Sequence, residues 1–288
     1  MTSRLLHPIL IPLLVLLTIH PGNGQARLSE DSLFVPSLGR TKKFRVLQPD
    51  HRDLSGRLPC LLLLHGFGGN YRNWTEFTTL QKDLGTTRLI VIMPDGENAW
   101  YTNSVADSSD RFEDYLVGDL LHTVATRYAV DTTRIGIAGL SMGGFGALTL
   151  GLRHPETFRF IGAMSASLDI PYGITTLEEH GRGGLREDLE KAFGTDSSRW
   201  ASHDAFRLLA RSDSAEIPYL YLVNGIQDEF AQRIDYYREF ASTLSYRHLP
   251  YEYHETPGHH DWSYWEREIP GVVRRFMEIV HPSGTTTH

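Results

Sequence analysis

The chain contains the stretch Arg134-Ile135-Gly136-Ile137-Ala138-Gly139-Leu140-Ser141-Met142-Gly143-Gly144-Phe145-Gly146-Ala147-Leu148-Thr149-Leu150. An apolar run, a G-x-S-x-G pentapeptide and a helix-compatible run follow one another there. A strand, a sharp turn and a helix in that order form a nucleophile elbow, which exposes a serine hydroxyl on a strained turn. A Cβ at Gly139 or Gly143 would crowd the place where strand and helix converge, and glycine tolerates the turn. The stretch therefore predicts Ser141 as a nucleophile.

Short apolar runs alternate with amphipathic segments outside this stretch. Continuous apolar runs suit strands covered on both faces, and they are Leu61–Leu64, Leu89–Met93, Ile135–Ala138, Phe160–Met164 and Tyr219–Val223. Phe44–Leu47 indicates an early antiparallel strand, and Tyr251–His254 indicates an edge strand. Helical patterns span Trp74–Leu84, Phe112–Tyr128, Met142–Arg153, Ser202–Ala210, Ala231–Leu244 and Trp262–Ile279. The alternation predicts an α/β fold with a mostly parallel central sheet and helices on both faces.

The N-terminal segment differs from the rest of the chain. Arg4 precedes the apolar run Ile9–Ile19, and the small residues Gly24 and Ala26 stand at the −3 and −1 places of a cleavage site. This pattern predicts a signal peptide over residues 1–26 and a single domain over 27–288. The apolar run is shorter than the ~20 residues that span a bilayer. We therefore expect a secreted or periplasmic protein without a stable membrane span after processing; an uncleaved membrane anchor is the alternative.

Composition bounds the remaining function classes. The chain has 288 residues, of which 41% are hydrophobic, and a net charge of −7. Mild acidity gives no electrostatic footprint for nucleic acid, so none is expected as a partner. The single cysteine, Cys60, precedes four leucines and is expected to be a small buried hydrophobic residue.

A serine nucleophile needs a base, and the base needs an acid that fixes its tautomer. On an elbow of this kind the chain order is serine, acid, histidine. Asp228 follows the run Tyr219–Val223, and His259 and His260 follow the run Tyr251–His254. These positions predict catalytic roles for Ser141, for Asp228 with Glu229 as a substitute acid, and for one of the two histidines. A metal site built from His254, His259, His260 and Asp261 is the alternative, but it lacks a recognised ligand spacing.

The reaction also needs N–H donors aimed at the oxyanion. One is the amide of Met142, directly after the nucleophile, and the other comes from the loop after the third strand. In Leu64-His65-Gly66-Phe67-Gly68-Gly69-Asn70 the second donor is expected at Phe67, with Gly68 as substitute. His65 precedes the serine, so a structural role is expected for it. No cofactor and no metal are expected.

Three further features have two interpretations each. Trp100, Tyr101 and Trp262 are predicted to line the substrate site, or else they pack in the core. The glycine-rich insertion Asp169–Thr195, with a possible helix over Leu185–Phe193, lies above the serine or is a surface excursion. Asn73 caps the first helix with Glu76 at the capping-box place, or it belongs to the glycosylation sequon Asn73-Trp74-Thr75.

Four motifs together carry a resemblance to a known family. They are His65-Gly66-Phe67-Gly68-Gly69-Asn70, the stretch from Pro94 to Ser104, Gly139-Leu140-Ser141-Met142-Gly143-Gly144, and Pro257-Gly258-His259-His260-Asp261-Trp262. The chain resembles the putative-esterase family of α/β-hydrolases, which includes S-formylglutathione hydrolase, tributyrin, feruloyl and acetylxylan esterases, and mycolyltransferases. The family's closing motif P-G-G-H-x-W aligns its histidine with His260 and places His259 at a glycine position. The family's G-G-N-S-W corresponds to Gly96-Glu97-Asn98-Ala99-Trp100, so Glu97 adds a carboxylate.

The residues and the resemblance together imply a secreted serine esterase that works through an acyl-enzyme. The expected substrates are small-molecule or carbohydrate-linked esters with short acyl groups. An acyltransferase with the same triad, an S-formylglutathione-type thioesterase and a non-catalytic binding protein are the alternatives.

Overall fold

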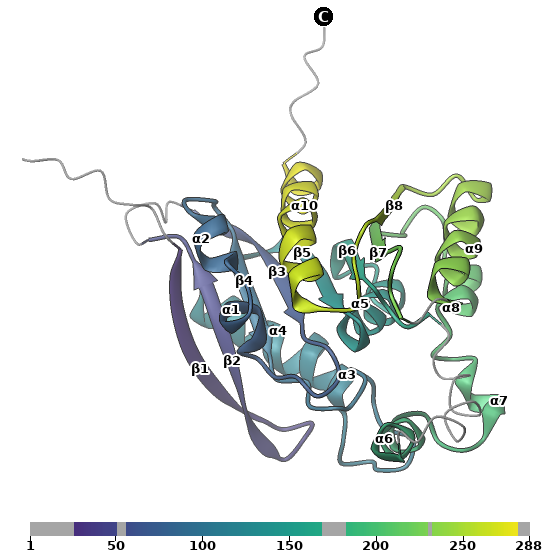
Figure 1. Ribbon diagram of the computed structural model, residues 1–288. Helices are drawn as coiled ribbons and strands as arrows, with labels where there is room; N and C mark the ends of the chain where they lie inside the picture. Colours follow the sequence, from purple (N-terminus) through teal and green to yellow (C-terminus); the bar gives the residue numbers. More distant parts are fainter. Residues whose placement is uncertain (1–25, 51–55, 169–182, 230–231, 282–288) are drawn as a thin grey trace, which may run out of the picture.

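The computed structural model describes residues 26–50, 56–168, 183–229 and 232–281 (Figure 1). Residues 1–25 of the predicted signal peptide, which spans residues 1–26, and residues 169–182 of the predicted insertion lie outside the described residues. Ala26 is described, and the first strand begins directly after it at Arg27.

Eight strands form one sheet in the order β1-β2-β4-β3-β5-β6-β7-β8, which runs from left to right in Figure 1. Strands β1 and β2 pair antiparallel, as do β2 and β4, and all later neighbours are parallel. The mostly parallel sheet is confirmed. The strands are β1 (Arg27–Val35), β2 (Arg40–Gln48), β3 (Leu58–Leu64), β4 (Ile90–Pro94), β5 (Val130–Leu140), β6 (Phe158–Met164), β7 (Tyr219–Gly225) and β8 (Tyr251–Thr256).

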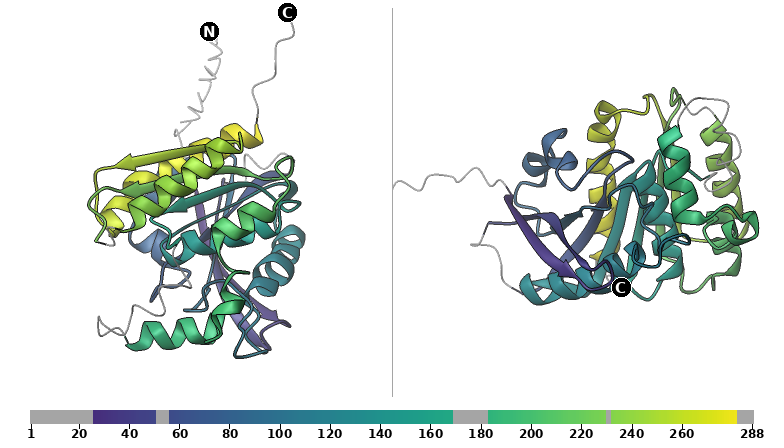
Figure 2. Two further views of the ribbon diagram at one scale, coloured as in Figure 1. Left: turned by 90° about the vertical axis from the view of Figure 1, so that its right-hand side faces the viewer. Right: turned by 90° about the horizontal axis from the view of Figure 1, so that it is seen from below.

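Helices cover both faces of this sheet (Figure 2). Successive side chains of a strand point to opposite faces, and both faces of β3 are apolar, so each face needs a cover. Leu61 and Leu63 pack with α1 (Asn73–Glu76), α2 (Leu80–Leu84) and α10 (Trp262–Val280). Leu62 and Leu64 belong to the core on the other face, which is covered by α3 (Phe112–Asp114), a π-helical turn (Tyr115–Leu120), α4 (Leu121–Arg127), α5 (Met142–Arg153), α8 (Ala205–Arg211) and α9 (Gln232–Tyr246).

The first helical segment differs from its prediction. Instead of one helix over Trp74–Leu84, two short helices are separated at Phe77–Thr79, where the Thr78 hydroxyl donates to the carbonyl of Trp74. Threonine side chains compete for backbone groups in this way. The predicted cap is wrong, because Asn73 is the first residue of α1 rather than the residue before it. Its side chain is buried and accepts the Asn70 N–H at 2.8 Å.

The insertion contains the predicted helix, which is α6 (Gly183–Phe193) and is followed by α7 (Ser197–Trp200). Phe193 packs near Trp100, Phe145 and His203, with ring centroids 4.9 to 6.1 Å apart. The N–H groups of Val105 and Ala106 donate to carbonyls at the end of α6. These contacts fix α6 against the loop that follows β4.

His203 is a buried histidine within this cluster. The Arg153 guanidinium donates to Nδ1 at 2.9 Å, so Nδ1 carries no proton. Burial, reinforced by the Arg153 charge, lowers the pKa of His203 from 6.5 to about 4. Between those values the unfolded chain binds a proton that the folded chain does not, so stability falls as the pH is lowered.

We therefore expect His203 to cost the fold about 3 kcal/mol between pH 6.5 and pH 4, at ~1.4 kcal/mol per pKa unit. In His203→Asn the amide oxygen replaces the Nδ1 acceptor and cannot titrate. Urea unfolding at pH 7 and pH 4.5 should show a smaller acid-induced loss of free energy in the variant than in the wild type. Equal losses in the two proteins would contradict this assignment.

Candidate active site

Ser141 lies on the turn between β5 and α5, as the elbow pattern predicts. Its φ of 51° and ψ of −115° place a non-glycine residue in a strained region of backbone space. A Cβ on Gly139 would overlap the carbonyl of Gly143, and one on Gly143 would lie 2.6 Å from the carbonyl oxygens of Leu64 and His65. Glycine at both positions is what allows β5, α5 and the end of β3 to converge behind the serine.

Two loops bring an acid and a base to Ser141. The Ser141 hydroxyl donates to Nε2 of His260 at 2.9 Å, and Nδ1 of His260 donates to Oδ2 of Asp228 at 2.8 Å. The Asp228 side chain has no exposed surface, and that of His260 is 14% exposed. The His260 ring meets Trp265 of α10 edge to face at 5.0 Å, which limits its rotation. The three predicted residues thus form one hydrogen-bonded chain across three loops.

The neighbouring candidates His259 and Glu229 occupy a different place. His259 is 59% exposed, and its Nδ1 lies 3.3 Å from Oε1 of Glu229. The second carboxylate oxygen of Glu229 accepts the backbone N–H of His260 at 3.2 Å. The contacts to Ser141 and Asp228 therefore belong to His260, the position that the resemblance favours. Glu229 contacts the backbone of the histidine loop.

The predicted oxyanion loop lies beside Ser141. A Cβ on Gly66 would be 3.6 Å from Cβ of Ser141, so the loop that follows β3 touches the elbow. The Gly68 amide donates to Oδ1 of Asn98 at 2.8 Å. The N–H of Gly68, the substitute donor, is therefore already used within the fold. The N–H groups of Phe67 and Met142, the two predicted donors, have no recorded acceptor among the described residues.

His65 is used within the fold. Its Nδ1 donates to the carbonyl of Gly66 at 2.8 Å, and its Nε2 accepts the N–H of Gly96 at 2.9 Å. Burial lowers the pKa of His65, which keeps the ring neutral. Because both ring nitrogens are occupied, His65 joins the oxyanion loop to the loop after β4 and has no nitrogen left to act as a base.

The three aromatic residues lie in different surroundings. Tyr101 is fully buried and its hydroxyl donates to the carbonyl of His65 at 2.8 Å, which favours core packing for this residue. Trp100 is also buried and packs on Phe145 of α5. Trp262 is half-buried at the start of α10, where it contacts Trp74 and the exposed ring of Phe77. Of the three, Trp262 has the largest surface available for a ligand.

Sequence reasoning missed the contacts that fix the loop after β4. Glu97 pairs with Arg40 and Lys42 of β2 at 3.0 and 2.6 Å, and Lys42 is almost wholly buried. Asn98 accepts from Gly68 and donates to Asp188 of α6 at 3.1 Å, beside a small polar hollow of about 240 Å³. The one feature of the sequence that could have indicated these ion pairs is Glu97 itself, which stands where the family has glycine. Its partner, Lys42, lies fifty-five residues away in sequence.

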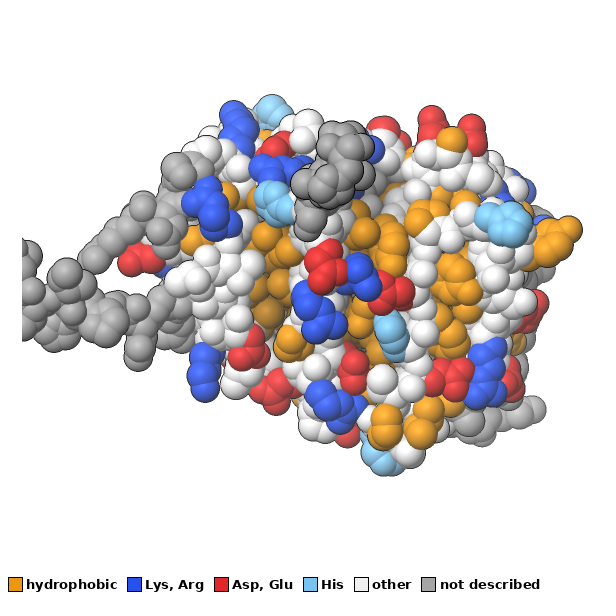
Figure 3. Space-filling view, turned by 90° about the horizontal axis from the view of Figure 1, so that it is seen from above, with side chains coloured by type: hydrophobic (Ala, Val, Ile, Leu, Met, Phe, Trp, Pro, Cys, Tyr) orange, Lys and Arg blue, Asp and Glu red, His pale blue; other side chains and the backbone are white. Residues whose placement is uncertain are grey.

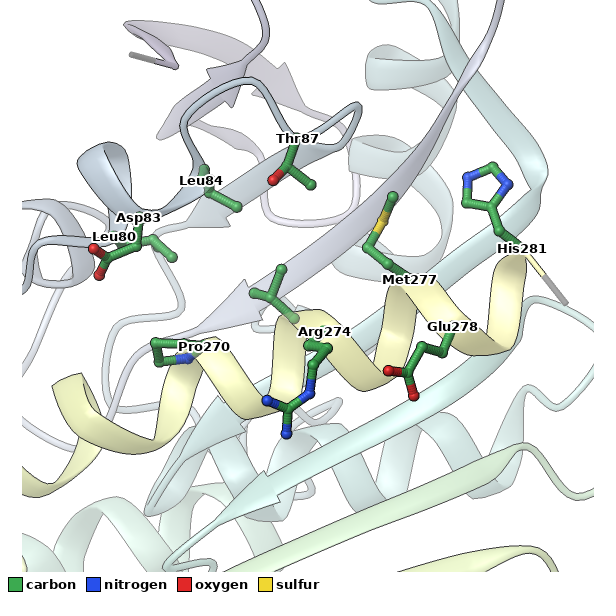
Figure 4. A pocket seen from close by; sticks show the side chains of 10 residues that line it. Leu80, Asp83, Leu84, Thr87, Pro270, Arg274, Met277, Glu278 and His281 are labelled. Atoms are coloured by element: carbon green, nitrogen blue, oxygen red, sulfur yellow. The ribbon is translucent and has the colours of Figure 1, made fainter. Parts of the chain in front are cut away.

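A larger groove of about 490 Å³ lies between α2 and the second half of α10 (Figure 4). Pro270, Met277 and His281 line one side of it, and Leu80 and Leu84 line the other. Figure 3 looks down on the molecule from above and shows hydrophobic side chains between charged ones on that face. The candidate site lies at the start of α10, where Trp262 follows closely after His260. The groove lies along the second half of the same helix, away from that site.

The described residues include no group of three or more His, Cys, Asp or Glu side chains placed to hold a metal ion. Within the same residues, no helix has the length and apolar character needed to cross a bilayer. Cys60 is buried, and burial raises the pKa of its thiol to about 12.

Comparison with known proteins shows which family the chain belongs to. A family model described as "Putative esterase" matches residues 35–276. The chain is 27% identical over 240 residues to an acetyl esterase of Caldicellulosiruptor saccharolyticus, covering 78% of this chain and 85% of that protein. It is 30% identical over 264 residues to an esterase of Mycobacterium tuberculosis, covering 83% of this chain but only 57% of that protein's length.

The fold is also shared with solved structures. The structure of FphF, a fluorophosphonate-binding serine hydrolase of Staphylococcus aureus, aligns with a TM-score of 0.75 at 24% identity, covering 89% of this chain and 99% of that one. This similarity confirms the predicted α/β-hydrolase fold.

Proposed function

The chain belongs to the family described as "Putative esterase" and is a carboxylic ester hydrolase; we propose that it cleaves esters through an acyl-enzyme on Ser141. The observation that carries this proposal is the hydrogen-bonded chain Ser141–His260–Asp228, with distances of 2.9 and 2.8 Å. A hydroxyl, a neutral imidazole and a buried carboxylate in this order are what activates a serine at neutral pH.

In the first half of the reaction, Ser141 Oγ attacks the acyl carbonyl while Nε2 of His260 takes its proton. The carbonyl becomes a tetrahedral oxyanion, which the amides of Phe67 and Met142 stabilise. Asp228 holds Nδ1 of His260 and stabilises the imidazolium. His260 then returns the proton to the alcohol oxygen, the C–O bond of the ester breaks, and the acyl group stays on Ser141.

In the second half, water replaces the alcohol. His260 takes a proton from the water, whose oxygen attacks the acyl carbon through a second oxyanion. The bond to Ser141 Oγ breaks, the serine recovers its proton from His260, and the carboxylic acid leaves. The reacting groups of this cycle come from the chain, the ester and water.

For the acyl group we propose a short chain. The similarity to an acetyl esterase supports this. Trp100, Phe145 and Phe193 are also buried and pack against one another beside α5, the helix that begins at the elbow, and we propose that they limit the length of the acyl group. A carbohydrate-linked alcohol remains the proposed leaving group, in keeping with the expected export of the protein.

The test is a substrate panel with p-nitrophenyl acetate, butyrate and octanoate, methyl ferulate and acetylated xylan, in which Ser141→Ala provides the blank. We expect kcat/KM to fall at least about tenfold from acetate to octanoate. An acyl chain longer than its pocket should raise the activation free energy by more than about 1.4 kcal/mol through overpacking. Equal or rising values along the series would contradict a short acyl site. Product analysis with acceptor alcohols present separates hydrolysis from acyl transfer.

We also propose that the protein is exported and cleaved after Ala26. The start of β1 at Arg27 supports this, because the strands of the sheet all follow the proposed cleavage point. Intact mass of the protein recovered from outside the cytoplasm should correspond to a chain starting at Arg27. A mass that retains residues 1–26 would overturn the proposal.

A further inference from the structure

The loops that follow β7 and β8 are joined to each other by hydrogen bonds. The N–H of Ile226 donates to the carbonyl of Thr256, and the N–H of Gln227 donates to that of Gly258, both at 3.0 Å. In return, the N–H of Gly258 donates to Oε1 of Gln227 at 2.5 Å. The first loop carries Asp228 and the second carries His260, so these bonds hold acid and base in register.

Glu229 continues this pairing to the catalytic histidine itself. Its Oε2 accepts the backbone N–H of His260 at 3.2 Å, and its Oε1 lies 3.3 Å from Nδ1 of His259. Asp228 therefore binds the side chain of His260, while the adjacent Glu229 binds its backbone. The backbone N–H groups of Glu229 itself and of His260 keep the pKa of the Glu229 carboxyl below its usual range, so it is ionised at neutral pH.

We infer that Glu229 is a positioning residue for His260, and that His259 orients the Glu229 carboxylate. This inference rests on the proposed function of His260 as the base. The family places glycine at the position of His259, so the pair of Glu229 and His259 is a feature of this chain's own sequence. Glu229 is 62% exposed, as a solvated surface carboxylate would be, but its two oxygens contact both His259 and the backbone of His260.

The expected effect is on turnover and not on substrate affinity. A misplacement of a catalytic group by about 1 Å can cost 10²-fold in rate. Glu229 contributes one solvent-exposed bond among several that hold the loop, so we expect Glu229→Ala to lower kcat about tenfold. KM should stay within about twofold, because Glu229 is not assigned to a substrate contact.

Glu229→Gln provides the conservative rescue. Its amide oxygen still accepts the His260 N–H, although the negative charge is lost, so kcat should stay within about threefold of the wild type. The matched control is Glu239→Ala on α9, an exposed glutamate whose carboxylate has no recorded partner among the described residues. The kcat of this control should match that of the wild type.

In Asp228→Asn, kcat should fall about 10⁴-fold, as expected for the residue that fixes the tautomer of His260.

The experiment measures kcat and KM for p-nitrophenyl acetate in these four variants and the wild type, with hydrogen–deuterium exchange of the 257–261 loop. The inference predicts low kcat with unchanged KM and faster exchange in Glu229→Ala, and recovery in Glu229→Gln. An unchanged kcat in Glu229→Ala, a rise in KM alone, or an equal loss in the Gln variant would overturn it. An inert wild type would instead refute the proposed function, which separates the two failures.

Discussion

Replacing Ser141 with alanine is expected to lower the turnover of p-nitrophenyl acetate about 10⁶-fold, the loss typical of a serine nucleophile in a catalytic triad. The hydroxyl is the only group removed, and its oxygen is the atom that forms the acyl-enzyme. His260 and the amides of Phe67 and Met142 would remain and could still assist the attack of water weakly. A residual rate above the uncatalysed reaction is therefore compatible with the mechanism.

The same variant should keep the fold. Alanine has the Cβ that serine already carries at φ 51°, so no new backbone strain arises. The buried neighbours Gly139 and Gly143 are untouched, and we expect the free energy of unfolding to change by less than about 1 kcal/mol. Urea unfolding and circular dichroism check this. Near-normal turnover in a folded Ser141→Ala protein would rule out Ser141 as the nucleophile.

The two adjacent histidines should give very different results. His260→Ala removes the base that accepts the Ser141 proton, and we expect about a 10⁶-fold loss of turnover, similar to the loss of the serine itself. His259→Ala removes an exposed side chain whose recorded partner is Glu229, and we expect a loss of about threefold. The contrast follows from geometry, because Nε2 of His260 lies 2.9 Å from the nucleophile.

Steady-state assays of the two single variants and the double variant measure this contrast. In the double variant, the loss should equal that of His260→Ala, since a site without its base gains nothing from positioning. A larger loss in His259→Ala than in His260→Ala would reverse the assignment. It would also show that the histidine loop takes a different arrangement in solution.

Most of the sheet could be predicted from the sequence because its strands are buried on both faces. Runs such as Leu61–Leu64 contain no polar residue, and such continuous apolar runs are typical of strands covered on both faces. β1 was not predicted, because Arg27–Val35 lies at the sheet edge and carries polar residues at most positions. The break between α1 and α2 also could not be predicted, since it involves the hydroxyl of Thr78, between the two helices, bonding back to the carbonyl of Trp74 in α1.

That Ser141, Asp228 and His260 come together could be predicted for a different reason. The carboxyl ends of parallel strands meet at one edge of the sheet, so residues after β5, β7 and β8 come together whatever the loops between them do. Contacts between two loops are not encoded so simply. The bond from Gly68 to Asn98 and that from His260 to Glu229 each depend on loop conformations that no local pattern specifies.

The most direct test of the central claim is to treat the full-length wild-type protein with a fluorophosphonate probe and map the labelled peptide by mass spectrometry. The mechanism predicts one covalent adduct on Ser141, formed readily in the wild type and absent in Ser141→Ala and strongly slowed in His260→Ala. An unlabelled wild type, or an adduct on another residue that persists in Ser141→Ala, would contradict it.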